Sequence, residues 1–217
     1  MKTAAVFGTT GLIGNHLIQL LSNSNEYQKI YSYARRKPES QQNKVEHIDF
    51  NVYALKVPEG IDDVFVCLGT TMKKAGSKEA FRKIDYEMVV EIAKQSKAAQ
   101  AKHFVVVSSL GADPSTGNFY LRTKGEMEED VKKMNFEYCG IVRPSLLLGN
   151  RKEFRFGEKI GIALFKVFNF IFVGPLKKFR GIKAEDVAKS MIMLALNGKG
   201  TVTVESNILK QIADEYK

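Results

Sequence analysis

Tyr120 and Lys124 stand four residues apart in the segment YLRTK, and their side chains suit acid–base chemistry. Residues at positions i and i+4 share one face of a helix, so this spacing would place an ammonium beside a phenol. A nearby positive charge lowers the pKa of a phenol, and such a tyrosine can exchange a proton with a carbonyl or alcohol oxygen near neutral pH. Ser109 ends an apolar run shortly before this pair and would hydrogen-bond the same oxygen.

A glycine-rich segment, GTTGLIG, separates an apolar run at Thr3–Phe7 from a helical pattern. Glycine lets the backbone turn tightly and approach a ligand, and a helix N-terminus offers unpaired N–H groups and the positive end of its dipole. The segment therefore predicts a cradle for a dinucleotide, although its GxxGxxG spacing differs from the best-known fingerprint and a plain tight turn is the alternative. The residues expected to contact the cofactor here are Gly8, Thr10, Gly11, Leu12, Ile13 and Gly14.

Two arginines, Arg35 and Arg36, follow the second apolar run, where enzymes that prefer NAD usually carry a carboxylate for the ribose 2′-hydroxyl. A guanidinium binds a 2′-phosphate through charge-assisted, often bidentate hydrogen bonds. The arginines therefore favour NADP(H) over NAD(H), with a solvated basic loop as the alternative.

The other expected cofactor contacts also follow strands, because ligands of open α/β sheets lie at the carboxyl ends of the strands. Asp49 would either accept a hydrogen bond from the adenine amino group or cap the short helix that follows it. Lys124 would also hold the nicotinamide ribose hydroxyls. The remaining candidates are Phe50, Leu68, Gly69, Thr70, Thr71, Pro144 and Leu146.

Short apolar runs alternate with helical patterns along the chain. Several of these runs contain almost no polar residue, which is typical of strands covered on both faces. The pattern predicts an α/β fold, a doubly wound, Rossmann-like parallel sheet flanked by helices. The expected strands are Thr3–Phe7, Lys29–Ala34, Val45–Asp49, Asp63–Leu68, His103–Ser108, Glu137–Val142 and Thr201–Glu205. The expected helices are Gly11–Ser22, Lys78–Ala99, Tyr120–Met134, Glu158–Phe172, Ala184–Asn197 and Ser206–Glu215, with a single helical turn at Val52–Leu55.

The composition is that of an ordinary globular protein, with 217 residues, 44% hydrophobic and 26% charged residues. This length fits one domain over residues 1–217. The two cysteines lie inside apolar runs and the three histidines are far apart, so we expect buried free thiols and no metal site. The net charge of +9 is spread over the chain without a nucleic-acid motif, so we expect a small-molecule substrate rather than nucleic acid. With no signal peptide or membrane span apparent, we expect a cytoplasmic location.

The segment from Phe154 to Phe179 combines apolar residues around most of a helix with flanking lysines. We expect this helix to pack on the substrate side of the core, half-exposed in a homodimer. The alternative is an apolar lid that admits a hydrophobic substrate or touches a membrane without stable insertion.

These motifs together resemble the atypical short-chain dehydrogenases/reductases, in particular the Tat-interacting-protein oxidoreductases. The resemblance rests on the glycine segment, the two arginines and four longer blocks: CLGTTMKKAG, KHFVVVSSLGAD, YLRTKGEME and RPSLLLGNRKEFRFGE. It implies an NADP-binding fold with a Ser109, Tyr120 and Lys124 set. It also implies that a small C-terminal region, at about residues 150–183, covers the substrate. The best-known members of the superfamily carry an asparagine on the helix after the fourth strand, and here the matching segment reads Ile84-Asp85-Tyr86.

The sequence thus favours an NADP(H)-dependent reductase or dehydrogenase that acts on a small carbonyl or alcohol. A protein that binds NADP(H) for regulation, without catalysis, is the alternative, because some members of the resembled family act as regulators.

Overall fold

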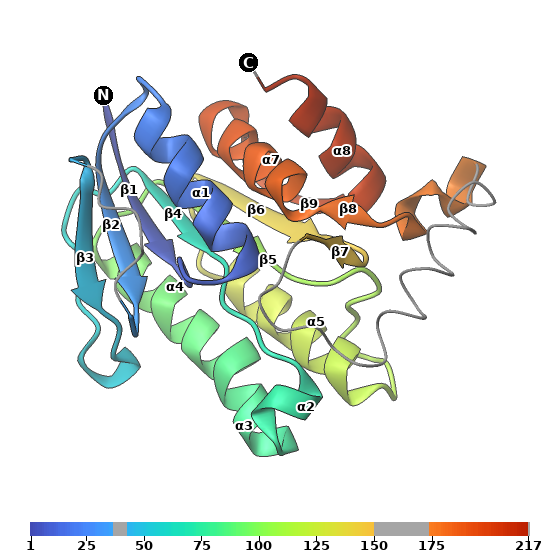
Figure 1. Ribbon diagram of the computed structural model, residues 1–217. Helices are drawn as coiled ribbons and strands as arrows, with labels where there is room; N and C mark the ends of the chain where they lie inside the picture. Colours follow the sequence, from blue (N-terminus) through green and yellow to red (C-terminus); the bar gives the residue numbers. More distant parts are fainter. Residues whose placement is uncertain (37–42, 150–173, 217) are drawn as a thin grey trace.

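A seven-stranded parallel sheet forms the centre of the computed structural model, which describes residues 1–36, 43–149 and 174–216 (Figure 1). The strand order is β3-β2-β1-β4-β5-β6-β9, so the order reverses between β1 and β4. This is the doubly wound arrangement that the alternating pattern predicts. The strands are β1 (Lys2–Phe7), β2 (Tyr27–Ala34), β3 (Val45–Asp49), β4 (Asp63–Val66), β5 (His103–Val107), β6 (Tyr138–Arg143) and β9 (Gly200–Glu205).

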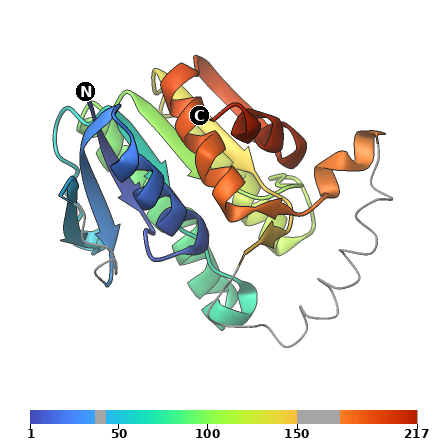
Figure 2. The same ribbon diagram turned by 45° about the horizontal axis from the view of Figure 1, so that its top comes forward.

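Helices cover both faces of the sheet, which explains the nearly unbroken apolar strands (Figures 1 and 2). One face carries α1 (Leu12–Asn23), α7 (Ala184–Asn197) and α8 (Ser206–Asp214). The other carries α4 (Met88–Ala98) and α5 (Phe119–Lys132). All four residues of β4 are buried between these layers.

Each of the seven expected strands is present, with ends that differ by at most two residues. The helix expected over residues 78–99 is interrupted: α3 (Lys78–Arg82) runs into a π-helical turn, η2 (Lys83–Glu87), and continues as α4. A π-helical turn inserts one extra residue into a helix, which a count of apolar positions does not reveal.

Several short elements complete the described part of the chain. A 3₁₀ turn, η1 (Val52–Ala54), occupies the place of the expected single helical turn. The others, which the sequence did not predict, are α2 (Met72–Ala75), β7 (Leu147–Leu148), η3 (Gly174–Phe179) and β8 (Ile182–Lys183), with β7 pairing with β8. The expected helix over 158–172, and most of the region expected to cover the substrate, lie outside the described residues.

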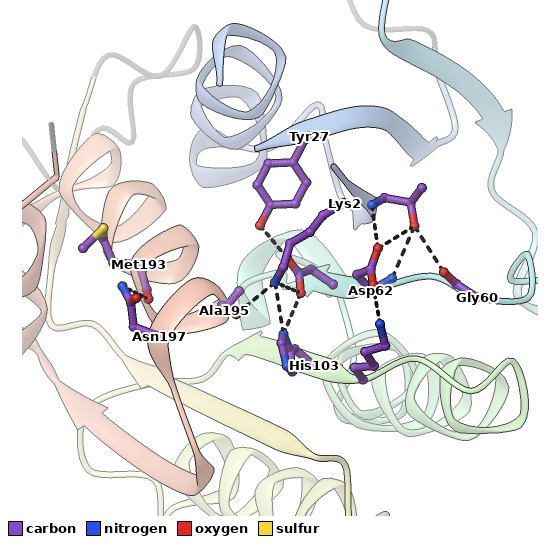
Figure 3. Close-up of polar contacts among 11 residues, drawn as sticks. Lys2, Tyr27, Gly60, Asp62, His103, Met193, Ala195 and Asn197 are labelled. Atoms are coloured by element: carbon purple, nitrogen blue, oxygen red, sulfur yellow. Dashed lines mark hydrogen bonds and ion pairs between the residues drawn. The ribbon is translucent and has the colours of Figure 1, made fainter. Parts of the chain in front are cut away.

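A buried polar cluster joins four adjacent strands at the amino end of the sheet. We call Lys2, Tyr27, Asp63 and His103 the amino-end cluster (Figure 3). The Asp63 carboxylate is fully buried and accepts hydrogen bonds from Lys2 Nζ at 3.0 Å, from the Tyr27 hydroxyl at 2.5 Å and from His103 Nδ1 at 2.7 Å. Every donor comes from a different strand, so the cluster ties β1, β2, β4 and β5 together.

Both cysteines are free thiols, with Cys139 buried and Cys67 partly buried. Burial raises the pKa of the Cys139 thiol to about 11 and that of Cys67 further, so both are neutral near pH 7. Within the described residues no helix combines the length and apolar character that crossing a bilayer requires.

Candidate active site

The glycine turn between β1 and α1 is packed so closely that side chains would not fit. Gly8 has a φ of +83°, and a Cβ atom there would lie 2.9 Å from the Cys67 carbonyl oxygen. A Cβ at Gly14 would lie only 2.3 Å from the Gly8 carbonyl oxygen. Gly11 precedes α1 and has no side chain to cap it, so the amino end of the helix keeps open N–H groups. This cradle fits the pyrophosphate of a dinucleotide.

Thr9 was not among the predicted site residues, yet it anchors the glycine turn. Its side chain is buried and lies 2.9 Å from the Ser32 hydroxyl on β2, whereas its neighbour Thr10 is exposed at the tip of the turn. The GTTG pattern alone does not reveal which of its two threonines is buried.

Arg35 and Arg36 are exposed immediately after β2 and make no ion pair with any residue that the structure describes. Asp49 is exposed at the last position of β3, 3.2 Å from His47 Nε2. The alternative that Asp49 caps the following helical turn is wrong, because the Asn51 side chain accepts the hydrogen bond from the Tyr53 N–H.

Aromatic and aliphatic side chains from neighbouring strand ends pack beside the glycine turn. The Phe50 ring meets Phe7 edge-on with centroids 5.8 Å apart, and Leu68 lies against Gly8. Two of the predicted contacts, Phe50 and Leu68, therefore lie next to the cradle. Farther along the β4 loop, Thr71 caps α2 by accepting a hydrogen bond from the Lys74 N–H.

The turn after β5 and the start of α5 are held together through their backbones. Asp113 N–H donates to the Leu121 carbonyl at 3.2 Å. A Cβ at Gly125 would lie 2.3 Å from the Pro114 nitrogen, so this glycine allows α5 to touch the turn. Ser109 lies in this turn, and the packing fixes it relative to the helix that carries Tyr120.

The loop after β6 joins the same edge of the sheet. The Leu110 N–H donates to the Pro144 carbonyl at 3.1 Å, and the Leu146 carbonyl accepts from the Ile182 N–H at 3.0 Å. The Leu12 side chain lies 3.1 Å from where a Cβ at Gly149 would stand. The loop thus runs from the Ser109 turn to the amino end of α1.

Tyr120 and Lys124 lie one turn apart on α5, as predicted, but the ammonium is not directly paired with the phenol. The Tyr120 ring packs against Phe81 with centroids 5.3 Å apart, and its hydroxyl has no hydrogen-bond partner among the described residues. Lys124 Nζ lies 2.7 Å from Asp85 Oδ1. The sequence places the two residues on one face, but it missed this competing carboxylate.

Asp85 comes from the middle of η2, which packs against α5. Its side chain is 1% exposed and that of Lys124 is 4% exposed. Asp85 Oδ2 accepts a hydrogen bond from the Thr70 N–H at 2.8 Å, whereas the contact of Oδ1 with Lys124 lacks hydrogen-bond alignment. The carboxylate thus joins the β4 loop to the helix with Tyr120 and Lys124.

A second buried carboxylate that the sequence missed lies behind the Ser109 turn. Glu128 on α5 accepts from the Ser108 hydroxyl at 2.5 Å and from the Arg143 guanidinium at 2.8 and 2.6 Å. The hydrogen bond to Glu128 raises the pKa of Arg143. This network fixes the end of β5 against α5.

The chain also matches known proteins. The model of a family described as NAD(P)H-binding matches residues 8–161. The FMP52 protein of Candida glabrata is 35% identical over 229 residues, covering 100% of this chain and 97% of the relative. Rat HTATIP2 is 37% identical over 164 residues, covering 72% of this chain and 67% of the relative.

These relatives correct the expected location. The FMP52 proteins of several yeasts, including Debaryomyces hansenii and Meyerozyma guilliermondii, are named mitochondrial, which contradicts the cytoplasmic expectation. That expectation used the lack of an apparent signal peptide and membrane span, and neither feature distinguishes one aqueous compartment from another.

Solved structures agree with the fold. The oxidoreductase ylbE of Lactococcus lactis has a TM-score of 0.66 at 18% identity and covers 99% of this chain and 98% of that chain. MoeE5, solved with UDP-glucose and NAD, has a TM-score of 0.70 at 15% identity and covers 99% and 81%. With its family model, relatives and Rossmann-like sheet in agreement, the chain belongs to the NAD(P)H-binding family, among the atypical short-chain dehydrogenases/reductases related to HTATIP2 and FMP52.

Proposed function

We propose that the protein is an NADP(H)-dependent oxidoreductase that acts on a small carbonyl or alcohol. The bound cofactor would supply or accept the hydride at the substrate carbon. In the direction of reduction, the Tyr120 hydroxyl gives its proton to the carbonyl oxygen, and Ser109 donates a hydrogen bond to that oxygen. Lys124 binds the nicotinamide ribose hydroxyls.

The observation that carries this proposal is the docking of α5 on the turn after β5 at Gly125. It holds Ser109 and Tyr120 on adjoining elements at the edge of the sheet where the glycine turn presents open N–H groups. General acid–base catalysis requires the proton donor within reach of the reacting atom, and this packing fixes the two hydroxyl-bearing residues relative to each other.

Replacement of the phenol hydroxyl tests the mechanism. Tyr120→Phe should lower kcat by at least about a hundredfold, because a positioned acid–base group contributes that much, and should leave the Kd for NADPH nearly unchanged. Turnover would be followed by NADPH absorbance across a panel of aldehydes and ketones. Tyr216→Phe serves as the control, because Tyr216 packs against the hydrophobic core that includes α1 and α7 and has no part in the proposed mechanism. Equal turnover by wild type and Tyr120→Phe would rule out this role for the tyrosine.

The cofactor preference rests on the exposed Arg35 and Arg36. Changing both to alanine should weaken NADPH binding by about tenfold or more, since a charge-assisted hydrogen bond contributes roughly 1.5–3 kcal/mol. NADH binding should change little, because NADH lacks the 2′-phosphate. Calorimetric titration with both cofactors measures the difference, and an equal loss for both would contradict a 2′-phosphate site.

One observation favours a second candidate, a non-catalytic NADP(H)-binding regulator. Lys124 faces Asp85, and the Tyr120 hydroxyl lacks a partner within the described chain. Such a protein would bind NADPH through the glycine turn and make no use of the tyrosine. Robust NADPH oxidation with any member of the carbonyl panel would reject it.

A further inference from the structure

Asp85 stands where an ionic side chain is costly, with its carboxylate almost fully buried beside an almost fully buried ammonium. Two features place it there: it belongs to the π-helical turn, and it accepts the hydrogen bond from the Thr70 N–H. A buried ion pair is not generally more stable than an apolar pair of similar volume, so stability alone does not explain it.

We propose that Asp85 is a positioning residue that holds Lys124 and that its negative charge sets the pH at which Tyr120 exchanges a proton. This inference rests on the proposed function, because it assigns Asp85 a part in the same site. An ammonium whose carboxylate partner lies 2.7 Å away acts on a third group as a dipole rather than as a full charge. Lys124 therefore favours ionisation of Tyr120 less than an unpaired lysine would.

Other charged groups near this pair are already neutralised or face solvent. Within η2, Lys83 and Glu87 are exposed. Cys67, which follows β4, is kept neutral by burial, which raises the pKa of its thiol. Three pairs on the surrounding elements are bonded to one another: Arg82 with Glu126, Tyr86 with Asp130, and Arg143 with Glu128. Lys73 and Glu129 are exposed. Asp85 is thus the carboxylate that balances Lys124.

The variant Asp85→Asn keeps the side-chain shape and an acceptor for Thr70 N–H but removes the charge. It should move the midpoint of the kcat–pH profile to lower pH by about one unit, because Lys124 then acts as an unbalanced cation. Asp85→Glu restores the charge and should move the midpoint back toward the wild-type value. Asp130→Asn is the matched control: it removes a carboxylate that bonds the same π-helical turn through Tyr86, and it should leave the midpoint in place.

A second readout does not need turnover. Ultraviolet difference titration, comparing each chain with the same chain carrying Tyr120→Phe, reports ionisation of the Tyr120 phenol alone. Its midpoint should fall in Asp85→Asn, rise in Lys124→Met, and return close to wild type in the double variant, which removes both charges. If Asp85→Asn does not fold, the difference in phenol midpoint between the double variant and Lys124→Met still measures the effect of the carboxylate.

The outcomes separate this inference from the proposed function. Suppose that the protein oxidises no NADPH, but that the phenol midpoint falls in Asp85→Asn and rises in Lys124→Met. The role of Asp85 would then stand, and the proposed enzymatic function would be rejected. Unchanged midpoints in Asp85→Asn and Lys124→Met, or shifts in the same direction, would overturn the role of Asp85 even in an active enzyme.

Discussion

Two aspartates at opposite ends of the same sheet are both buried, yet they are bonded very differently. Asp63, in the amino-end cluster, is surrounded by donors from three other strands. Asp85, at the carboxyl edge, accepts one backbone hydrogen bond and faces one ammonium without hydrogen-bond alignment. Asp63 has three hydrogen-bond donors, all within the amino-end cluster, and its contacts hold the strands together. Asp85 has fewer partners, and it faces Lys124, one of the residues of the proposed catalytic set.

The largest effect that this contrast predicts is on stability at the amino end. Asp63→Asn should lower the free energy of unfolding by roughly 3–5 kcal/mol, because it leaves the Lys2 charge and the Tyr27 and His103 donors poorly paired. NADPH affinity of the folded protein should stay the same. Urea unfolding and NADPH titration measure the two quantities. A loss mainly in NADPH affinity would contradict a purely structural role for Asp63.

A smaller effect concerns alkaline pH and the Tyr27 hydroxyl. Burial, and then the charge of Asp63, raise the pKa of Tyr27 in the folded state far above its ordinary value of about 10. The folded state therefore holds this proton more tightly, so the contribution to stability is complete below about pH 10 and is lost as the pH rises further.

Tyr27→Phe should thus cost about 1 kcal/mol at pH 7 and make the decline of stability above pH 10 less steep. Urea unfolding from pH 7 to 11 provides the measurement. Tyr53→Phe is the control, because Tyr53 is 79% exposed. Parallel declines in wild type and Tyr27→Phe would show that the tyrosine proton is not linked to folding.

The smallest effect belongs to Asp62, the neighbour of the amino-end cluster in Figure 3. Burial tends to raise the pKa of Asp62, but hydrogen bonds from Lys102 at 2.8 Å and from the Thr3 N–H at 2.9 Å outweigh it and hold the pKa below its ordinary value. Its contribution to stability is therefore present above about pH 4 and is lost as the pH falls through the lowered pKa.

Asp62→Asn should cost no more than about 1 kcal/mol at pH 7, because Lys102 is largely exposed and its charge is screened. The difference from wild type should shrink between pH 5 and 3, as followed by urea unfolding. A difference that persists at the acid end would assign the effect to packing rather than to charge.

The sequence predicts the sheet well because strands covered on both faces leave unbroken apolar runs, such as those of β4 and β5. It also places Tyr120 and Lys124 on one helix face, since their spacing is local. Asp85 pairs with Lys124 across 39 positions through a π-helical turn, and no local pattern reveals that contact. The amino-end cluster could have been predicted from the strand starts. Four polar residues each begin a strand: Lys2, Tyr27, Asp63 and His103.

The glycine at position 125 lets α5 and the turn after β5 meet through their backbones. Because main chain meets main chain there, the register between α5 and the turn after β5 does not depend on which side chains surround them. Under the proposed function, substitutions of the surrounding side chains could therefore change the substrate without moving Ser109 relative to Tyr120. Any larger residue at position 125 would push α5 away from this turn.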